Sequence, residues 1–246
     1  MTTFALIGKT LTHAFSKAFF DEKFLRENIT GCRYLLAPLP SIDELIGFIK
    51  SNPHLKGLNV TIPYKQAVLP LLDAVDPVAG EVGAANTIVI KRRRESIWLK
   101  GYNTDVFGFE NSCDGLRHAQ RALVLGSGGA AKAAGFVLQK NGIDYLTVSR
   151  NPKNENEIAY RDVDAGLLDS HNLIVNTTPL GMFPDVKSFP PLPYQQLSRH
   201  HFLFDMIYNP AETEFLKRGK AVGAATQNGL QMLTLQAEKA WEIWNS

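Results

Sequence analysis

Short apolar runs alternate with stretches of helical periodicity along the first part of the chain. The runs at 4–7 and 34–37 have the length of buried strands, and apolar positions recur at helical spacing through about 17–28. The segment 41–44 matches a capping box, which predicts a second helix directly after it. Strand, helix, strand and helix in succession predict a mainly parallel α/β sheet, with sites at the carboxyl ends of its strands.

The same patterns predict further elements downstream. A third strand is expected at 58–61, closed by Pro63, and two more at 87–90 and 97–99 around a basic run at 91–95. We interpret that run as a solvated hairpin tip rather than a nucleic-acid patch. A helix is predicted over 104–116, strands at 173–175, 202–204 and around 221–222, and a final helix over 230–244.

The strongest chemical signal is a glycine-rich turn between an apolar strand and an alanine-rich helix. The strand 123–125 leads into Gly126, Ser127, Gly128, Gly129 and Ala130, with the spacing G-x-G-x-x-A. In a dinucleotide site the first glycine makes the tight turn, and the second lets backbone N–H groups approach a pyrophosphate. The helix N-terminus adds unpaired donors and partial positive charge. Such a turn is also used as a simple tight connection, so both interpretations remain open on this motif alone.

The end of the next strand distinguishes between two cofactors. The apolar run 145–148 is followed by Ser149, Arg150 and Asn151, whereas an NAD site places an acidic residue there to hold the ribose. A guanidinium suits a 2′-phosphate, so the sequence predicts NADP. The alternative is an exposed arginine at a strand end.

Composition narrows the class of protein. The 246 residues leave room for one large or two modest domains, and a formal net charge of +2 gives no field that favours nucleic acid or membrane partners. The two cysteines, Cys32 and Cys113, lack metal-site spacing, as do the six histidines, so reduced thiols and no metal are expected. No signal-peptide pattern begins the sequence. We therefore expect a cytoplasmic protein.

From 59 to 65 the chain reads Asn-Val-Thr-Ile-Pro-Tyr-Lys, and here it resembles the shikimate dehydrogenase family. Further matching motifs follow in order over nearly the whole chain: 13–16, 83–87, 103–105, 126–131, 149–151, 176–178, 205–208 and 229–236. The resemblance implies an α/β fold with a substrate domain over 1–103, a Rossmann-type NADP domain over 104–226 and a cleft between them. It also implies that residues 227–246 form a terminal helix returning to the first domain.

The resemblance also implies a reaction and a site. Enzymes of the family interconvert shikimate and 3-dehydroshikimate with NADP, in the biosynthesis of chorismate and the aromatic amino acids, as monomers or homodimers. Lys65 takes the catalytic position with Asp105 as its partner. The implied substrate-binding residues are Ser16, Thr61, Asn86, Tyr208 and Gln236. The implied cofactor-binding residues are Gly126, Ser127, Gly128, Gly129, Ala130, Ser149, Arg150, Asn151, Thr177, Met206 and Gly229.

The residue types at the catalytic position suit proton transfer in one direction. A nearby carboxylate favours charged lysine, which opposes the use of Lys65 as a base near neutrality. In the reductive direction a charged Lys65 donates its proton to the forming alkoxide. Our hypothesis is that Lys65 is the proton donor and that Asp105 mainly orients it and the substrate.

The sequence departs from the family pattern H-S-x-S-P, because Ala14 stands at its first serine. One of two hydroxyls expected at the substrate carboxylate is missing, and a hydrogen bond to a charged group is worth about 1.5 to 3 kcal/mol. Weaker shikimate binding, a substituting water or preference for quinate or another ring acid are the alternatives. A non-catalytic sensor on the same fold is a further alternative, although it has no need for both Lys65 and Asp105.

Overall fold

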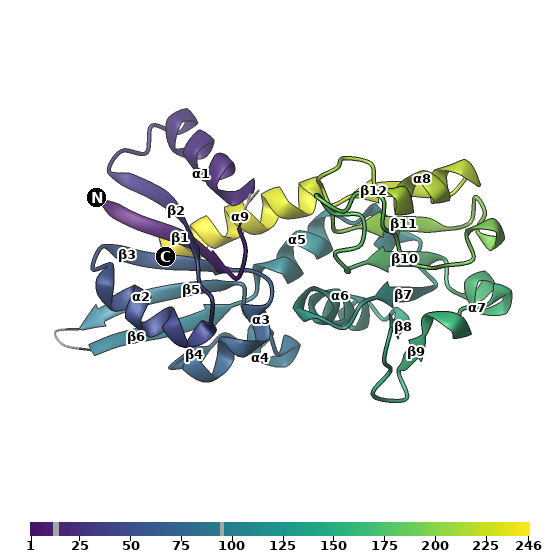
Figure 1. Cartoon of the computed structure of the whole chain (residues 1–246), viewed down its shortest axis with the longest axis horizontal. Helices are drawn as coiled ribbons and strands as arrows, with labels where there is room; N and C mark the ends of the chain where they lie inside the picture. The colour runs from purple at the N-terminus through teal and green to yellow at the C-terminus, as the bar shows by residue number, and fades with distance from the viewer. Residues whose placement is uncertain (12–14, 94–95) are drawn as a thin grey trace. The chain divides into compact units, whose positions relative to one another are not determined.

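The computed structural model describes residues 1–11, 15–93 and 96–246 (Figure 1). Ala14, with its departure from the family pattern, and the expected hairpin tip at 94–95 lie outside the described residues. The chain divides into two compact units. Unit 1 comprises Met1–Thr104 and Gln236–Ser246, and unit 2 comprises Asp105–Leu235.

Unit 1 contains a mixed six-stranded sheet with the order β2-β1-β3-β5-β6-β4. Its strands are β1 (Thr2–Gly8), β2 (Cys32–Pro38), β3 (Leu55–Val60), β4 (Ala74–Val75), β5 (Thr87–Arg93) and β6 (Ser96–Tyr102). Three of the five pairings are parallel, as the alternation of strands and helices predicts. The pairings of β5 with β3 and β6 are antiparallel. The pairing with β6 follows from the hairpin that joins these two consecutive strands.

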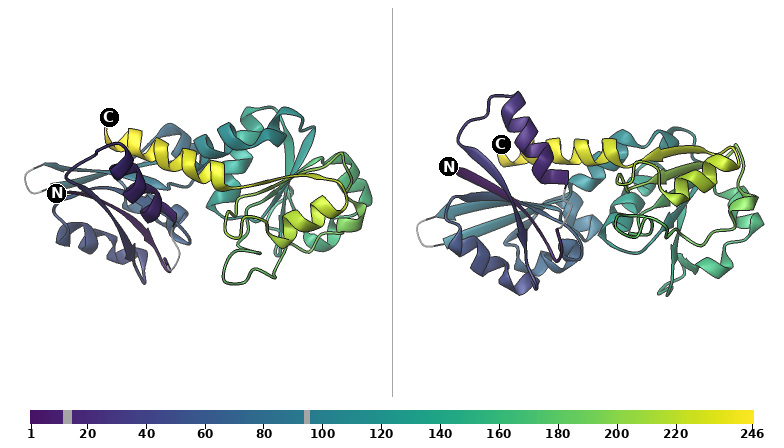
Figure 2. Two further views of the ribbon diagram at one scale, coloured as in Figure 1. Left: turned by 90° about the horizontal axis from the view of Figure 1, so that it is seen from above. Right: turned by 45° about the horizontal axis from the view of Figure 1, so that its top comes forward.

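The period-two alternation of β1 gives unit 1 two apolar cores. Ala5 and Ile7 face a core shared with Leu45 and Ile49. Phe4 and Leu6 face an aromatic core on the other side of the sheet. The helices of this unit are α1 (Phe15–Arg26), α2 (Leu45–Ser51), α3 (Tyr64–Ala67), α4 (Pro77–Val82) and the C-terminal part of α9 (Leu230–Trp244), with 3₁₀ helices η1 (Ile42–Glu44) and η2 (Leu69–Leu71). The helices α1 and α9 cover the aromatic face (Figures 1 and 2).

The capping box expected at 41–44 forms differently. The Ser41 hydroxyl accepts from the backbone N–H of Asp43, two residues on, at 3.3 Å. That short-range bond caps the 3₁₀ turn η1, and α2 begins only at Leu45.

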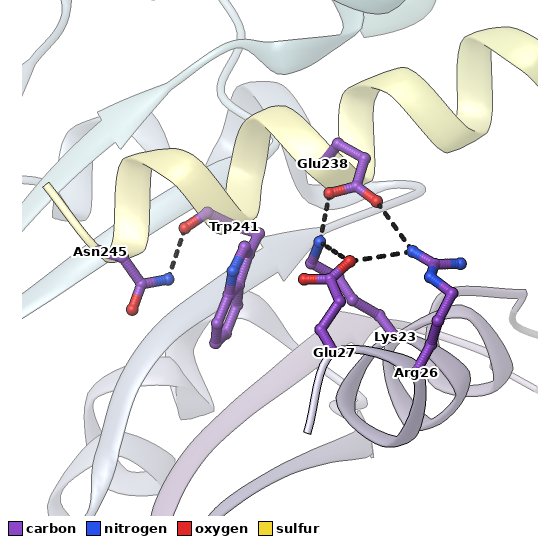
Figure 3. A network of polar contacts seen from close by, with 6 residues as sticks. All are labelled: Lys23, Arg26, Glu27, Glu238, Trp241 and Asn245. Carbon is purple, nitrogen blue, oxygen red and sulfur yellow. Dashed lines mark hydrogen bonds and ion pairs between the residues drawn. The ribbon is translucent and has the colours of Figure 1, made fainter. Parts of the chain in front are cut away.

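An ionic cluster fastens α9 to α1 within unit 1 (Figure 3). The buried Lys23 ammonium donates to Glu238 on α9 at 2.6 Å and to Glu27 at 2.8 Å, and Arg26 donates to Glu27 at 3.0 Å. Burial lowers the pKa of Lys23, but the bonds to the two carboxylates outweigh it and leave that pKa raised, so Lys23 stays charged. A second contact of α9 is made by Trp244, whose indole donates to the carbonyl of Ile88 at 3.0 Å.

Unit 2 contains an entirely parallel six-stranded sheet with the order β12-β11-β10-β7-β8-β9. Numbered from β7, this is the 3-2-1-4-5-6 order of the dinucleotide-binding Rossmann fold. The strands are β7 (Arg121–Leu125), β8 (Asp144–Ser149), β9 (Glu157–Ala159), β10 (Leu173–Asn176), β11 (Phe202–Asp205) and β12 (Ala225–Asn228). The helices are α5 (Thr104–Ser112), α6 (Gly129–Lys140), α7 (Ala165–Ser170) and α8 (Glu214–Ala221), with 3₁₀ helices η3 (Asp114–Arg117), η4 (Tyr160–Asp162) and η5 (Tyr194–Gln196). Among the residues described in the two units, no helix is long and apolar enough to cross a membrane.

The prediction of a strand around Ala221–Val222 was wrong. Ala221 ends α8, which Thr213 caps by accepting from the N–H of Leu216, and the last strand is β12. The apolar pair at 221–222 is too short to distinguish a strand from a helix end. The helix expected over 104–116 likewise ends at Ser112 and is continued by the 3₁₀ helix η3.

Candidate functional site

A buried polar cluster in unit 1 surrounds Asn86, directly before β5. Its side-chain oxygen accepts from the backbone N–H of Thr104 at 2.7 Å, and its amide donates to the side-chain oxygen of Gln236 at 3.4 Å. The Thr104 hydroxyl lies 3.1 Å from the Asn86 oxygen and 3.3 Å from the Gln236 oxygen. The structure therefore brings together two predicted substrate-binding residues that are 150 positions apart.

The polar groups continue from this cluster toward α1. Asn59 on β3 donates to the Thr87 hydroxyl at 3.2 Å and accepts from the Tyr34 hydroxyl at 2.7 Å. Ser16 on α1, another predicted substrate residue, bonds to Tyr34. Burial raises the pKa of Tyr34, so its phenol remains protonated and serves as a donor. Tyr34, Asn59 and Thr87 were missed as site residues, and the signal for them is a polar residue inside an otherwise apolar strand.

Thr61 and Lys65 follow β3 in the same unit. The N–H of Thr61 donates to the carbonyl of Ile7 at 2.9 Å, which extends the β1–β3 ladder by one bond. Lys65 lies on the short helix α3 and is half-buried. Its carbonyl accepts from Ala85 at 2.7 Å, so α3 is tied to the residue directly before Asn86.

The glycine turn of unit 2 has the geometry expected of a phosphate cradle. Gly126 has φ = +109°, and a Cβ there would lie 2.7 Å from the Thr177 hydroxyl. A Cβ on Gly128 would meet no atom within 4 Å, and no side chain caps the N-terminus of α6. The first N–H groups of this twelve-residue helix are therefore not taken up by a described capping side chain, and the helix begins after β7, beside the switch in strand order between β7 and β10. These residues fit a dinucleotide pyrophosphate.

The predicted ribose residues lie at the end of β8. Ser149 is buried, while Arg150 and Asn151 are exposed. Within the described part of the chain, Arg150 makes no hydrogen bond or ion pair. Its guanidinium is therefore available to an added anion.

A buried carboxylate, Asp205, organises the neighbouring strand ends. It accepts from the Asn176 amide and from the N–H of Ile207, both at 3.0 Å, and from the Thr213 hydroxyl. Asn176 in turn accepts from the N–H of Met206 through its carbonyl at 3.0 Å. Asp205 therefore fixes the backbone next to the predicted cofactor residues Thr177 and Met206, a role that sequence reasoning missed.

The remaining cofactor residue on this edge depends on close packing of backbone. The N–H of Gly229 donates to the carbonyl of Ile207 at 3.0 Å. A Cβ on Gly229 would lie 2.3 Å from the carbonyl oxygen of Met206, so only glycine fits there. Tyr208, predicted to bind substrate, follows Ile207 and is half-buried.

Asp205 gives the protein a specific dependence of stability on pH. Burial raises its pKa from 3.8 to about 6, against the opposing effect of its three hydrogen bonds. Because the folded state holds the proton more tightly than the unfolded state, this stabilisation is complete below about pH 4 and is lost as the pH rises through about 6. We expect the unfolding free energy of wild type minus that of Asp205→Asn to fall by about 1.4 kcal/mol between about pH 5 and about pH 7.5. Urea unfolding at several pH values measures this difference. The control is Asp144→Asn, because Asp144 is exposed. If the difference from wild type depends on pH equally for Asp205→Asn and Asp144→Asn, the expectation is contradicted.

Asp105 lies on α5 in unit 2 and is buried, whereas Lys65 belongs to unit 1.

The residues described hold no group of three or more His, Cys, Asp or Glu side chains that could bind a metal ion.

Unit 2 defines a Rossmann-type dinucleotide-binding protein, and the buried polar cluster of unit 1 is suited to a hydroxylated small molecule. Residues 6–88 match the family model of the shikimate dehydrogenase substrate binding domain. The chain is 36% identical over 262 residues to the shikimate dehydrogenase (NADP(+)) of Moorella thermoacetica, covering 98% of this chain and 86% of that protein. The chain therefore belongs to the shikimate dehydrogenase family.

Solved structures agree with this membership. Shikimate dehydrogenase 1 from Peptoclostridium difficile superposes with a TM-score of 0.86 at 34% identity, covering all of this chain and 92% of that one. A quinate dehydrogenase from Corynebacterium glutamicum, solved in complex with NAD, gives a TM-score of 0.84 at 28% identity, covering 99% of this chain and 93% of that one. The expected α/β fold with a Rossmann-type domain is confirmed.

Proposed function

We propose that this chain is an NADP-dependent oxidoreductase that reversibly reduces 3-dehydroshikimate to shikimate, in the biosynthesis of chorismate and the aromatic amino acids. The observation that carries the proposal is an uncapped helix after the glycine turn, with Arg150 at the end of the next strand, in a chain of this family. The cysteines described are free thiols, which supports a cytoplasmic setting. The protein acts as a monomer or homodimer.

The cofactor residues come from the carboxyl ends of the unit 2 strands. NADPH supplies the hydride when bound. The N–H groups of Gly128, Gly129 and Ala130 hold the pyrophosphate, with Gly126 and Ser127 shaping the turn. Ser149, Arg150 and Asn151 hold the 2′-phosphate end, and Thr177, Met206 and Gly229 line the edge toward the nicotinamide. Residues 104–226 form the NADP domain in this proposal.

The substrate residues come mainly from 1–103 and the terminal helix over 227–246. Asn86, Asp105 and Gln236 hold ring hydroxyls, and Ser16, Thr61 and Tyr208 hold the carboxylate. The charged Lys65 amine donates its proton to the oxygen that becomes the alcohol, and Asp105 orients Lys65 and the substrate. Asn86 and Gln236 are pre-positioned for this role, because the cluster around Thr104 already fixes both side chains.

Replacing Arg150 tests the cofactor part of the proposal. We expect Arg150→Ala to raise the KM for NADP about ten- to a hundredfold, because a hydrogen bond to a charged group contributes about 1.5 to 3 kcal/mol. The KM for NAD should change little, since NAD lacks the 2′-phosphate. Steady-state kinetics with both cofactors measures this. Arg161→Ala is the matched control, because Arg161 is an exposed arginine of the same unit, and an equal effect of both variants would contradict the assignment.

A second candidate is a dehydrogenase of the same family that acts on quinate or another hydroxylated ring acid. Ala14 in the sequence favours it, since a hydroxyl expected at the substrate carboxylate is absent. Turnover of quinate without turnover of shikimate would replace the first proposal with the second. Binding of the acid without any turnover would instead indicate a sensor.

A further inference from the structure

A pocket of about 250 Å³ lies beside the glycine turn in unit 2. Ser127 of the turn, Lys132 of α6 and Thr147 of β8 form part of its lining, together with Asn154 and Glu157 from the segment after Arg150. The pocket therefore adjoins the turn that the proposed function gives to the dinucleotide and the segment that follows Arg150.

Glu157 is the acidic group of this pocket, and it is placed by sheet register. It begins β9 and pairs with Thr147 of β8, so both side chains extend from the same face of the sheet. Its carboxylate accepts from the Ser149 hydroxyl at 3.4 Å, from the N–H of Lys153 at 3.1 Å and from the Asn154 amide at 3.1 Å. Glu157 thus accepts hydrogen bonds from residues that precede and follow Arg150 in the sequence.

The positive charges near the pocket are not neutralised by this carboxylate. Lys132 and Arg150 are both exposed, and within the described ranges the side chain of neither makes a hydrogen bond or an ion pair. The pocket and the neighbouring end of β8 therefore combine two available cations with one carboxylate that is bound to the loop. This arrangement contains features of both kinds of ribose site, since a carboxylate suits a free 2′-hydroxyl and a guanidinium suits a 2′-phosphate.

A 2′-phosphate held by Arg150 competes with Glu157 in two ways. It requires the same N–H and O–H donors that the carboxylate already occupies, and it brings negative charge toward the charge of Glu157. A ribose 2′-hydroxyl instead donates to a carboxylate, so NAD is not penalised. We propose that Glu157 sets the coenzyme selectivity of this protein by weakening its preference for NADP over NAD. This inference rests on the proposed function, because it concerns the dinucleotide site assigned there.

The test compares binding of adenosine 2′,5′-bisphosphate with binding of 5′-AMP, which differ only in the 2′-phosphate. Calorimetric titration gives the ratio of the two Kd values for each variant. Glu157→Gln removes the charge but keeps an acceptor, and we expect it to raise the preference for the bisphosphate about five- to tenfold. Glu157→Asp keeps the charge and should stay within about twofold of wild type. Glu155→Gln removes an exposed charge from the same loop and should also stay near wild type.

Other results would overturn the inference. If Glu157→Gln leaves the ratio unchanged, or if Glu157→Asp raises it equally, Glu157 only holds the loop and does not set selectivity. The binding test needs no turnover, so its failure is distinct from failure of the proposed function. Suppose that the wild type turns over shikimate but Glu157→Gln keeps the wild-type ratio of the two Kd values. The proposed function would then stand, and only the inference about Glu157 would be removed.

Discussion

Replacement of Lys65 with alanine is expected to lower kcat for reduction of 3-dehydroshikimate about 10²- to 10⁴-fold, the usual contribution of a positioned general acid. Without the amine, the group assigned to protonate the forming alkoxide is lost, and water must take over this proton transfer. The KM should change less than kcat, because in the proposed site the buried cluster around Asn86 would still hold the substrate hydroxyls. Steady-state kinetics in the reductive direction measures both quantities.

Lys50→Ala is the matched control for this experiment. Lys50 is an exposed lysine on α2 of the same unit, so its removal changes net charge equally without touching the proposed site. We expect it to retain wild-type kcat. Normal turnover and normal Michaelis constants in Lys65→Ala would eliminate Lys65 as the proton donor.

Replacement of Gly126 with alanine is expected to weaken NADP binding at least tenfold and to lower the free energy of unfolding by about 1 to 3 kcal/mol. The backbone there has φ = +109°, which an alanine side chain disfavours, and the new Cβ would lie 2.7 Å from the Thr177 hydroxyl. Thr177 donates to the carbonyl of Leu125 at 2.6 Å, so displacing it disturbs the end of β7 as well. Calorimetry with NADP and urea unfolding measure the two effects.

Gly166→Ala provides the comparison for Gly126→Ala. Gly166 lies on α7 of the same unit, where a Cβ would make only an ordinary contact at 3.6 Å. Alanine is the better helix former, so this variant should be slightly stabilised and should bind NADP as wild type does. Wild-type NADP affinity in Gly126→Ala would contradict the role of the turn.

Much of the fold could be predicted because its local signals agree with its long-range ones. The β7 strand, its glycine turn and α6 are consecutive in sequence, so one motif specified the central part of the Rossmann sheet. The antiparallel pairing of β5 with β3 could not be predicted in the same way. The hydrophobic pattern of β5 does not show which strand it pairs with in the sheet. At 221–222 the local signal was ambiguous, and the tertiary packing of α8 decided the structure there.

The candidate site was predictable only as far as the resemblance reached. The resemblance named Asn86 and Gln236, but it gave no reason why two residues 150 positions apart should lie in contact. The structure supplies that reason, because the Thr104 hydroxyl bonds to both side chains. Asp205 and Glu157 were missed as contributors, because their importance comes from hydrogen bonds to backbone and side chains that folding brings close. A carboxylate in sequence does not reveal whether it will be buried.

The proposed reaction is best tested by following the absorbance of reduced nicotinamide with the purified protein. Shikimate and quinate are each offered with NADP and with NAD. We expect reduction of NADP with shikimate, at a higher kcat/KM than in any other combination. Turnover of quinate alone, or no turnover of shikimate despite its binding, would contradict the assignment of this chain as an NADP-dependent shikimate dehydrogenase.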